Sequence, residues 1–258
     1  MQRHNFQHDG LNFSYLGDGD GDGGNGAPLI ALHAHWMEGA TYATLAKALA
    51  PEYRVIALDQ RGHGHSDHAP TYEREDYLGD LQAFYAHLGI KQAVLIGNSL
   101  GGVNAYQFAA RYPAQVRGLV VEDIGAEVHD DLNFILKWGG TFKTRQELEE
   151  RIGERLVPYL IDSFRQTADG WRLAFDVNDM IVSQNHLKGD HWKDWLASTC
   201  PALLIRGAES RVSKAELFEA MAARRPNTQL KVLKAGHVVH QDLTEEFAQA
   251  VRVFLQSL

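Results

Sequence analysis

The sequence predicts an α/β protein in which helices cover both faces of a parallel sheet. Short segments that are apolar throughout, such as residues 29–32 and 93–96, alternate with amphipathic segments such as residues 74–88. Strands of this kind are typical of a parallel sheet that is buried on both faces. The alternation stops near residue 124 and resumes near residue 199. A single α/β core that carries an insert is therefore expected.

The expected elements follow one another along the chain. Residues 11–16 alternate like a strand, and the Gly- and Asp-rich residues 17–26 indicate a long hairpin connection to the buried strand at 29–32. Further strands are expected at residues 53–58, 93–96, 116–121, 202–205 and 230–233. Helices are expected at residues 41–49, 74–88, 100–112, 147–161, 215–223 and 245–255.

Composition excludes several classes of partner. The 258-residue chain has 25 Lys and Arg against 33 Asp and Glu, and this net charge of −8 argues against nucleic acid or an anionic membrane. No apolar run approaches the length of a transmembrane helix, and the N-terminus lacks the apolar core of a signal peptide. A cytoplasmic protein without membrane insertion is expected. The single cysteine, Cys200, excludes an internal disulfide.

No established metal-binding spacing is present, so no metal site is expected. Asp18, Asp20 and Asp22 resemble the start of a calcium-binding loop. Position twelve of such a loop would be Leu29 instead of Glu, and no flanking helices are evident. The three aspartates therefore favour a solvated hairpin connection.

The strongest chemical signal is the sequence Gly97-Asn98-Ser99-Leu100-Gly101, which matches G-x-S-x-G. It follows an apolar strand and precedes a helix. A serine on such a sharp turn projects its hydroxyl outward, and only small residues two positions before and after it allow the turn. The amides at the start of the helix add positive potential beside the serine. Ser99 is the candidate nucleophile.

The sequence here resembles the α/β-hydrolase fold family, in its small, cap-bearing serine esterase branch. Residues 59–66 (DQRGHGHS) are similar to the family's D-x-R-G-x-G-x-S loop, and residues 33–36 (HAHW) stand where the family has H-G-x. Residues 235–237 (AGH) stand before the last helix, as in the family. The resemblance implies a mostly parallel eight-stranded sheet flanked by helices, with a helical cap.

By this resemblance residues 1–123 and 199–258 form the hydrolase core, and residues 124–198 form the cap or lid. The cap segment is rich in aromatic residues and has helical stretches without a convincing buried strand. An aromatic lid fits an apolar pocket for an acyl or alcohol group. The candidate pocket residues are Trp36, Trp138, Phe142 and Trp192. Each of them is also suited to packing inside the lid's own small core.

A serine nucleophile needs a base and a group that orients the base. His237 is the candidate base, because it follows the last strand in a Gly-bounded loop, whereas His240 lacks a preceding glycine. The family's usual acid position is occupied by Ser210, which cannot stabilise an imidazolium by charge. Asp123, at the end of the strand that follows the nucleophile helix, is favoured as the acid over Glu209. A helix N-cap would use the same residue type as Asp123.

The oxyanion of a tetrahedral intermediate needs two backbone donors. One is expected to be the N–H of Leu100, the residue after the nucleophile. By resemblance to the H-G-x loop, the second is the N–H of His35. Ala34 replaces the family's glycine there, which strains the loop only if its φ is positive.

Together these residues predict a serine hydrolase that cleaves carboxylic esters of small to medium acyl groups through an acyl-enzyme, without a cofactor. Its partner is a small ester-like molecule, and it is expected to be a monomer or homodimer. The same triad also suits a lactone, thioester, amide or carbon–carbon bond, because the pocket decides the substrate. A ligand-binding protein without activity is the alternative of another class, favoured by the displaced acid and Ala34.

Overall fold

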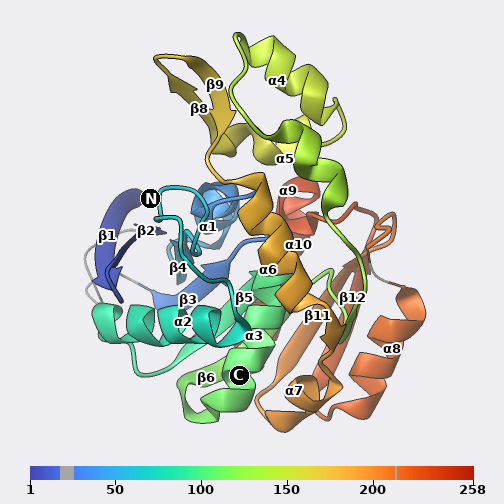
Figure 1. The fold of residues 1–258 in the computed structure, drawn as a ribbon. Coiled ribbons are helices and arrows are strands. Elements are labelled where there is room, and N and C mark those ends of the chain that lie inside the picture. The colour runs from blue at the N-terminus through green and yellow to red at the C-terminus, as the bar shows by residue number, and fades with distance from the viewer. Residues whose placement is uncertain (18–25, 213) are drawn as a thin grey trace.

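Eight strands form the central sheet of the protein, which we describe from a computed structural model of residues 1–17, 26–212 and 214–258 (Figure 1). The order is β1-β2-β4-β3-β5-β6-β11-β12. These strands are β1 (Gln2–His8), β2 (Leu11–Gly17), β3 (Ala27–Leu32), β4 (Tyr53–Leu58), β5 (Ala93–Asn98), β6 (Val116–Glu122), β11 (Ala202–Gly207) and β12 (Thr228–Leu233). The β1–β2 and β2–β4 pairs are antiparallel, and the other pairs are parallel. The predicted class, a mostly parallel eight-stranded sheet, is confirmed.

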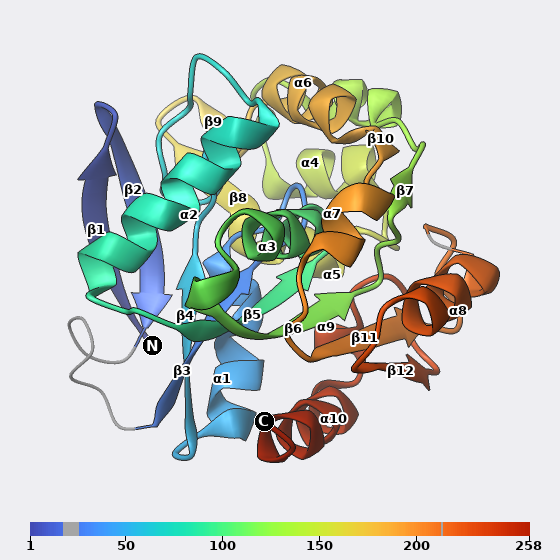
Figure 2. The same cartoon turned by 90° about the horizontal axis from the view of Figure 1, so that it is seen from below.

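Alternating side chains along each strand separate two apolar layers. In β3, Leu29 and Ala31 pack with one cluster, whereas Ile30 and Leu32 pack with the other, because successive side chains point to opposite faces. Figure 2 shows α2 and α3 on one face of the sheet and α1 and α10 on the other. The helices around the sheet are α1 (Ala43–Leu49), α2 (Arg74–Leu88), α3 (Leu100–Arg111), α8 (Ala215–Arg224), α9 (Val239–Asp242) and α10 (Thr244–Gln256), with 3-10 turns at η1 (Gly39–Tyr42) and η2 (Pro113–Gln115).

The prediction that residues 11–16 and 29–32 form a hairpin is wrong. β2 pairs with β1 and β4, and both edges of β3 are occupied by β4 and β5. β1 is an additional edge strand with one buried side chain, Phe6, so its sequence carries little hydrophobic periodicity. Most of the Gly- and Asp-rich connection, with Asp18, Asp20 and Asp22, lies outside the described residues.

The insert, residues 124–198, lies between β6 and β11 and is only partly helical. Its elements are β7 (Glu127–Val128), η3 (Asn133–Trp138), α4 (Arg145–Ile152), α5 (Val157–Leu160), η4 (Ile161–Ser163), β8 (Phe164–Thr167), β9 (Gly170–Leu173), α6 (Val177–Leu187), β10 (Gly189–Asp190) and α7 (Trp192–Ala197). The expectation of no strand here is corrected by two small sheets, β7 with β10 and β8 with β9. The strands escape detection because each has two to four residues.

The helix expected over residues 147–161 is divided in two. α4 ends at Ile152, and Gly153 follows with φ +95°, a conformation that favours glycine and stops a helix. The chain resumes as α5 after a turn. Side chains from α4, α5 and α6 form a separate apolar cluster around Trp138 and Leu148. The insert therefore has a small core of its own, as well as contacts with the main sheet through Trp195.

Among the described residues, no helix combines the length and apolar character needed to cross a membrane.

Candidate active site

The turn between β5 and α3 holds Ser99 in a conformation that non-glycine residues rarely adopt, with φ 51° and ψ −116°. A Cβ atom on Gly97 would lie 2.2 Å from the Gly101 carbonyl oxygen, and one on Gly101 would lie 2.0 Å from the Leu32 carbonyl oxygen. Both glycines are therefore required for the close approach of helix and sheet. This is the strand–turn–helix context that the motif predicted.

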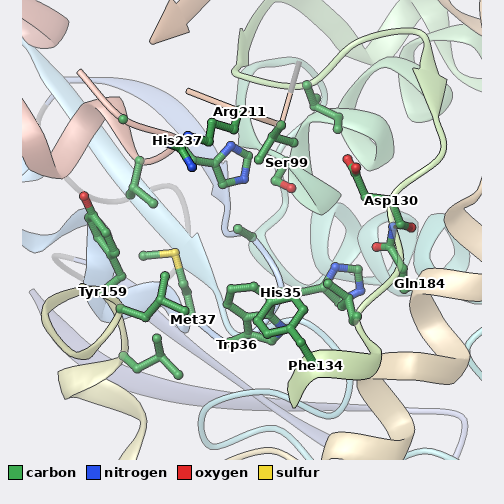
Figure 3. A pocket seen from close by; sticks show the side chains of 18 of the residues that line it. His35, Trp36, Met37, Ser99, Asp130, Phe134, Tyr159, Gln184, Arg211 and His237 are labelled. Atoms are coloured by element: carbon green, nitrogen blue, oxygen red, sulfur yellow. Dashed lines mark hydrogen bonds between the residues drawn. The ribbon is translucent and has the colours of Figure 1, made fainter. Parts of the chain in front are cut away.

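Asp123 and His237 meet at the carboxyl ends of the strands. His237 Nδ1 lies 2.7 Å from Asp123 Oδ2, and the carboxylate is fully buried. An N–H at Nδ1 that donates to Asp123 leaves Nε2 as the ring's free acceptor. Figure 3 shows the His237 ring and the Ser99 hydroxyl at the same end of one cavity, which both residues line.

The Asp123 carboxylate is fixed by two further donors. The backbone N–H of Gly207 donates to Oδ1 at 2.9 Å, and the hydroxyl of Ser210 donates to Oδ2. Ser210 thus contacts the carboxylate from the very position where the family's usual acid was expected. Glu209 has an exposed side chain, and its backbone N–H donates to the Ala235 carbonyl at 2.9 Å. The geometry brings Asp123 to the histidine and leaves Glu209 outside this contact.

The two candidate oxyanion donors follow two neighbouring strands of the sheet, His35 after β3 and Leu100 after β5. Leu100 is the first residue of α3, so its N–H has no partner one turn earlier in the helix. His35 lies in the loop after β3 and lines the cavity. Ala34 does not have a positive φ, whereas Trp36 has φ +71°. Alanine at position 34 therefore causes no strain, and the unusual backbone conformation falls two residues later.

A buried contact between His240 and Glu122 supports this arrangement. His240 Nδ1 lies 2.8 Å from Glu122 Oε2, both side chains are fully buried, and the His240 N–H donates to Glu122 at 2.9 Å. His240 Nε2 lies 2.9 Å from Thr41 Oγ1. The backbone carbonyl of Glu122 accepts the N–H of Ser99 at 3.1 Å. Glu122 therefore links β6 to both the nucleophile turn and α9, and His240 is a supporting residue.

The cavity has a volume of about 330 Å³ and lies between the core and the insert. Its wall is mainly apolar and includes Ile124, Val128, Leu132, Leu156, Leu160 and Leu187. Four charged side chains also line it: Asp130, Asp131, Arg155 and Arg211. A pocket that is largely apolar, with a few charged groups, suits a small organic substrate.

The structure places the four aromatic pocket candidates in different surroundings. Trp36 lines the cavity, and Trp138 packs behind it at a ring distance of 5.3 Å, buried in the insert's core. Phe142 pairs through its backbone with Trp171. Trp192 donates its indole N–H to Glu127 and lies under the Arg224 guanidinium. Trp138, Phe142 and Trp192 are thus outside the cavity lining, because they pack within the insert or at its base.

Sequence reasoning missed several lining residues, among them Met37, Tyr159, Arg155 and Arg211. Arg211 follows β11, at the edge of the sheet where the carboxyl ends of parallel strands create ligand sites. The place of Arg211 a few residues after an expected strand is the sequence feature that could have indicated it. Arg155 and Tyr159 belong to the insert, whose fold the pattern did not define.

Burial lowers the pKa values of three histidines beside the cavity. The pKa of His33 falls to about 4, mainly because its ring is removed from water. The pKa values of His35 and His63 lie well below the usual range for the same reason. All three rings are therefore neutral at neutral pH. Among the described residues, no group of three His, Cys, Asp or Glu side chains is placed to bind a metal ion.

The fold and this arrangement agree with comparisons of the chain with known proteins. Residues 24–250 match the model of the Alpha/beta hydrolase family, and the chain belongs to that family. The predicted family resemblance is confirmed.

A 2-(acetamidomethylene)succinate hydrolase of Mesorhizobium japonicum is 28% identical over 249 residues, which cover 91% of this chain and 90% of the relative. Esterase YbfF of Escherichia coli is 26% identical, over 90% of this chain and 94% of the relative. The crystal structure of an E-2-(acetamidomethylene)succinate hydrolase superposes with a TM-score of 0.89 over 99% of both chains, at 24% identity. Hydrolases are thus prominent among the similar proteins.

Proposed function

We propose that the protein is a serine hydrolase that cleaves carboxylic esters of small to medium acyl groups. The observation that carries this proposal is the 2.7 Å contact of His237 Nδ1 with the buried Asp123 carboxylate, in a cavity that Ser99 also lines. The strained turn at Ser99 and the largely apolar cavity support the same assignment.

In the acylation step, Ser99 Oγ attacks the ester carbonyl carbon, and its proton passes to His237 Nε2. The carbonyl oxygen becomes an oxyanion, which accepts hydrogen bonds from the N–H groups of Leu100 and His35. The C–O bond to the alcohol then breaks, and the imidazolium returns the proton to the leaving oxygen. Asp123 stabilises the imidazolium and keeps the ring in the required tautomer.

In the deacylation step, water attacks the carbonyl carbon of the acyl-enzyme while His237 removes its proton. The same two N–H groups bind the second oxyanion. Collapse of this intermediate breaks the bond between Ser99 Oγ and the acyl carbon, and His237 returns the proton to Ser99. The products are a carboxylic acid and an alcohol, and no cofactor takes part.

Hydrolysis of p-nitrophenyl esters with acyl chains of two to twelve carbons tests the size of the pocket. We expect kcat/KM to be highest for roughly two to eight carbons and to fall at least about tenfold at twelve, because the cavity is near the small end of ligand pockets. Leu156→Trp, which narrows the cavity, is expected to move the optimum to shorter chains. Leu196→Trp, at an exposed position outside the lining, serves as the matched control.

Activity that rises up to twelve carbons would contradict the proposed acyl range. If the protein hydrolyses a lactone, thioester, amide or carbon–carbon bond and not these esters, the proposed triad stands but the proposed scissile bond is wrong. A protein that turns over none of these substrates and resists fluorophosphonate labelling at Ser99 would be a ligand-binding member of the family.

A second candidate function is hydrolysis of an ester or amide that also carries a carboxylate. Arg155 and Arg211 line the cavity, and neither has a hydrogen bond or ion pair to another described residue. Figure 3 shows Arg211 beside His237, with Asp130 on the other side of Ser99. A substrate carboxylate is expected on the Arg211 side, away from Asp130. The name of the Mesorhizobium relative, a hydrolase of a substituted succinate, supports this candidate.

Comparison of p-nitrophenyl hemisuccinate with p-nitrophenyl butyrate tests the carboxylate. Arg211→Ala is expected to lower kcat/KM for the hemisuccinate about three- to tenfold, and less at high salt, because the guanidinium is exposed and screened. The butyrate rate should stay within about twofold. Arg224→Ala is the matched control, since Arg224 lies over Trp192 outside the cavity. An equal loss for both esters would reject an anion site at Arg211.

A further inference from the structure

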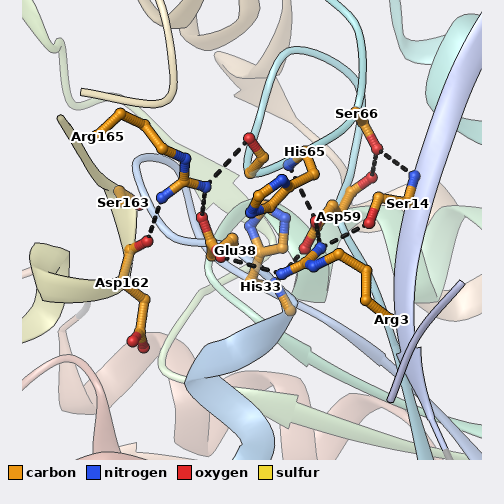
Figure 4. Close-up of polar contacts among 12 residues, drawn as sticks. Arg3, Ser14, His33, Glu38, Asp59, His65, Ser66, Asp162, Ser163 and Arg165 are labelled. Carbon is orange, nitrogen blue, oxygen red and sulfur yellow. Dashed lines mark hydrogen bonds and ion pairs between the residues drawn. The ribbon is translucent and has the colours of Figure 1, made fainter. Parts of the chain in front are cut away.

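The loop that follows β3, residues 33–38, is attached to the insert at three of its residues. His35 Nε2 lies 2.9 Å from Ser183 Oγ on α6, and the Ser163 hydroxyl of η4 donates to the Trp36 carbonyl at 2.6 Å. Glu38 forms an ion pair with Arg165 of β8 (Figure 4). Two separate segments of the insert, α6 and the continuous stretch of η4 and β8, therefore contact the loop that carries the second candidate oxyanion donor.

We propose that Ser183 and Ser163 are positioning residues that hold the His35 amide in place to bind the oxyanion. The insert then takes part in catalysis through the core loop that it fixes, in addition to forming one wall of the cavity. This inference rests on the proposed function. It assigns to two buried hydroxyl groups, both outside the triad, an effect on the stability of the transition state.

The peptide unit that bears the His35 N–H is held from both ends. Its carbonyl, on Ala34, accepts a hydrogen bond from His33 Nδ1 at 2.7 Å. Because C=O and N–H point in opposite directions in a trans peptide, this contact sets the direction of the His35 N–H. On the other side, the contact of Ser183 with the His35 ring fixes the Cα position. A shift of either end would rotate the donor away from the oxyanion.

The Ser183 hydroxyl belongs to a buried chain of polar groups. Tyr77 Oη lies 2.7 Å from Ser183 Oγ, and the side chains of Ser183, His35 and Tyr77 are all buried. A hydroxyl that accepts from Tyr77 and donates to His35 Nε2 satisfies both neighbours. Removal of the Ser183 hydroxyl leaves a ring nitrogen and a phenol without this partner in a dry environment, which drives the ring to a new position.

Ser163 acts on the backbone of Trp36, the residue that follows His35. Trp36 has φ +71°, a value that persists in a bulky residue only when its surroundings impose it. The Ser163 hydroxyl restrains the Trp36 carbonyl, and the Trp36 ring is held edge-on between Trp138 at 5.3 Å and Phe134 at 5.6 Å. All three restraints come from the insert. The loop conformation beside His35 therefore depends on the insert being seated.

The test uses the full chain and p-nitrophenyl butyrate. Ser183→Ala and Ser163→Ala are each expected to lower kcat about ten- to a hundredfold with KM changed less than about threefold, since misplacement of a donor weakens the transition state more than the ground state. The inhibition constant of a butyl trifluoromethyl ketone, whose adduct with Ser99 bears an oxyanion, should rise by a similar factor. In an His35→Ala background, Ser183→Ala should have little further effect.

Ser198→Ala is the matched control, because Ser198 is a buried serine of the insert whose hydroxyl accepts from Arg225, outside the cavity lining. It should leave kcat and the inhibition constant within about twofold. Melting temperatures of all variants separate this effect from unfolding, and Tyr77→Phe, which keeps the contact of Ser183 with His35, gives a milder test on the same chain of groups.

The proposal is overturned if both serine variants match the Ser198→Ala control, or if KM rises while kcat and the inhibition constant stay constant. Wild-type protein that neither turns over esters nor reacts with a fluorophosphonate would instead refute the serine-hydrolase function, and the positioning role with it. Active wild type with unaffected serine variants refutes the positioning role alone.

Discussion

Replacement of Ser99 with alanine is expected to reduce kcat for p-nitrophenyl ester hydrolysis by roughly a millionfold, to the level left by substrate binding and the oxyanion donors. The reason is that no acyl-enzyme forms without the Ser99 oxygen. KM should change little, since the cavity wall is unaltered. Steady-state kinetics on wild type and variant, purified in parallel, measure both values.

Covalent labelling provides an independent measurement on the same residue. A fluorophosphonate should modify wild-type protein at Ser99, identified by peptide mass, and should leave Ser99→Ala unmodified. Ser198→Ala, a buried serine substitution outside the cavity lining, should be labelled like wild type. Retention of more than about a tenth of the activity in Ser99→Ala would exclude this serine as the nucleophile.

Replacement of Asp123 with asparagine is the second large effect, with an expected loss of about ten-thousandfold in kcat. The buried carboxylate accepts from His237 Nδ1 at 2.7 Å and from the Gly207 N–H at 2.9 Å. An asparagine can keep its oxygen toward Gly207 only by turning its NH₂ group toward His237. The ring would then adopt the tautomer in which Nε2 carries the proton and cannot accept one from Ser99.

Glu209→Gln is the control that separates the two acids. The Glu209 side chain is exposed, so its substitution should leave kcat within about twofold. A thousandfold loss in Glu209→Gln, together with mild effects of Asp123→Asn, would reverse the assignment of the acid. Circular dichroism and melting temperature of both variants should accompany the kinetics, because Asp123 also ties β6 to the loop after β11.

The sheet explains why the Asp123 carboxylate, at the end of β6, reaches His237, although the family's usual acid lies in the loop after β11. β6 and β11 are parallel neighbours, and the Asp123 N–H donates to the Ile205 carbonyl at 2.8 Å. Their carboxyl ends therefore approach the same point in space. The hydroxyl of Ser210, from the β11 loop, meets the Asp123 carboxylate there. A carboxylate moved by one strand keeps its place beside the histidine.

The sequence by itself determined the class of fold and the turn at Ser99, and it favoured Asp123 over Glu209 as the carboxylate beside His237. Apolar strands alternate with amphipathic helices over the core, and this periodicity is a local property that needs no knowledge of distant contacts. Gly97 and Gly101 mark a close approach of backbone that no other residue permits. Asp123 and His237 could be expected together because each follows a strand whose carboxyl end faces the same edge.

Only the tertiary structure decided the strand neighbours of β2, the fold of the insert and the lining of the cavity. β2 lies beside β4 because both edges of β3 are taken by longer parallel pairings, which no local pattern encodes. The aromatic pocket candidates look alike in sequence, yet Trp36 of the core lines the cavity and Trp138 of the insert is buried behind it. Burial of a large apolar side chain gains similar free energy in either place, so packing of the whole chain chooses between them.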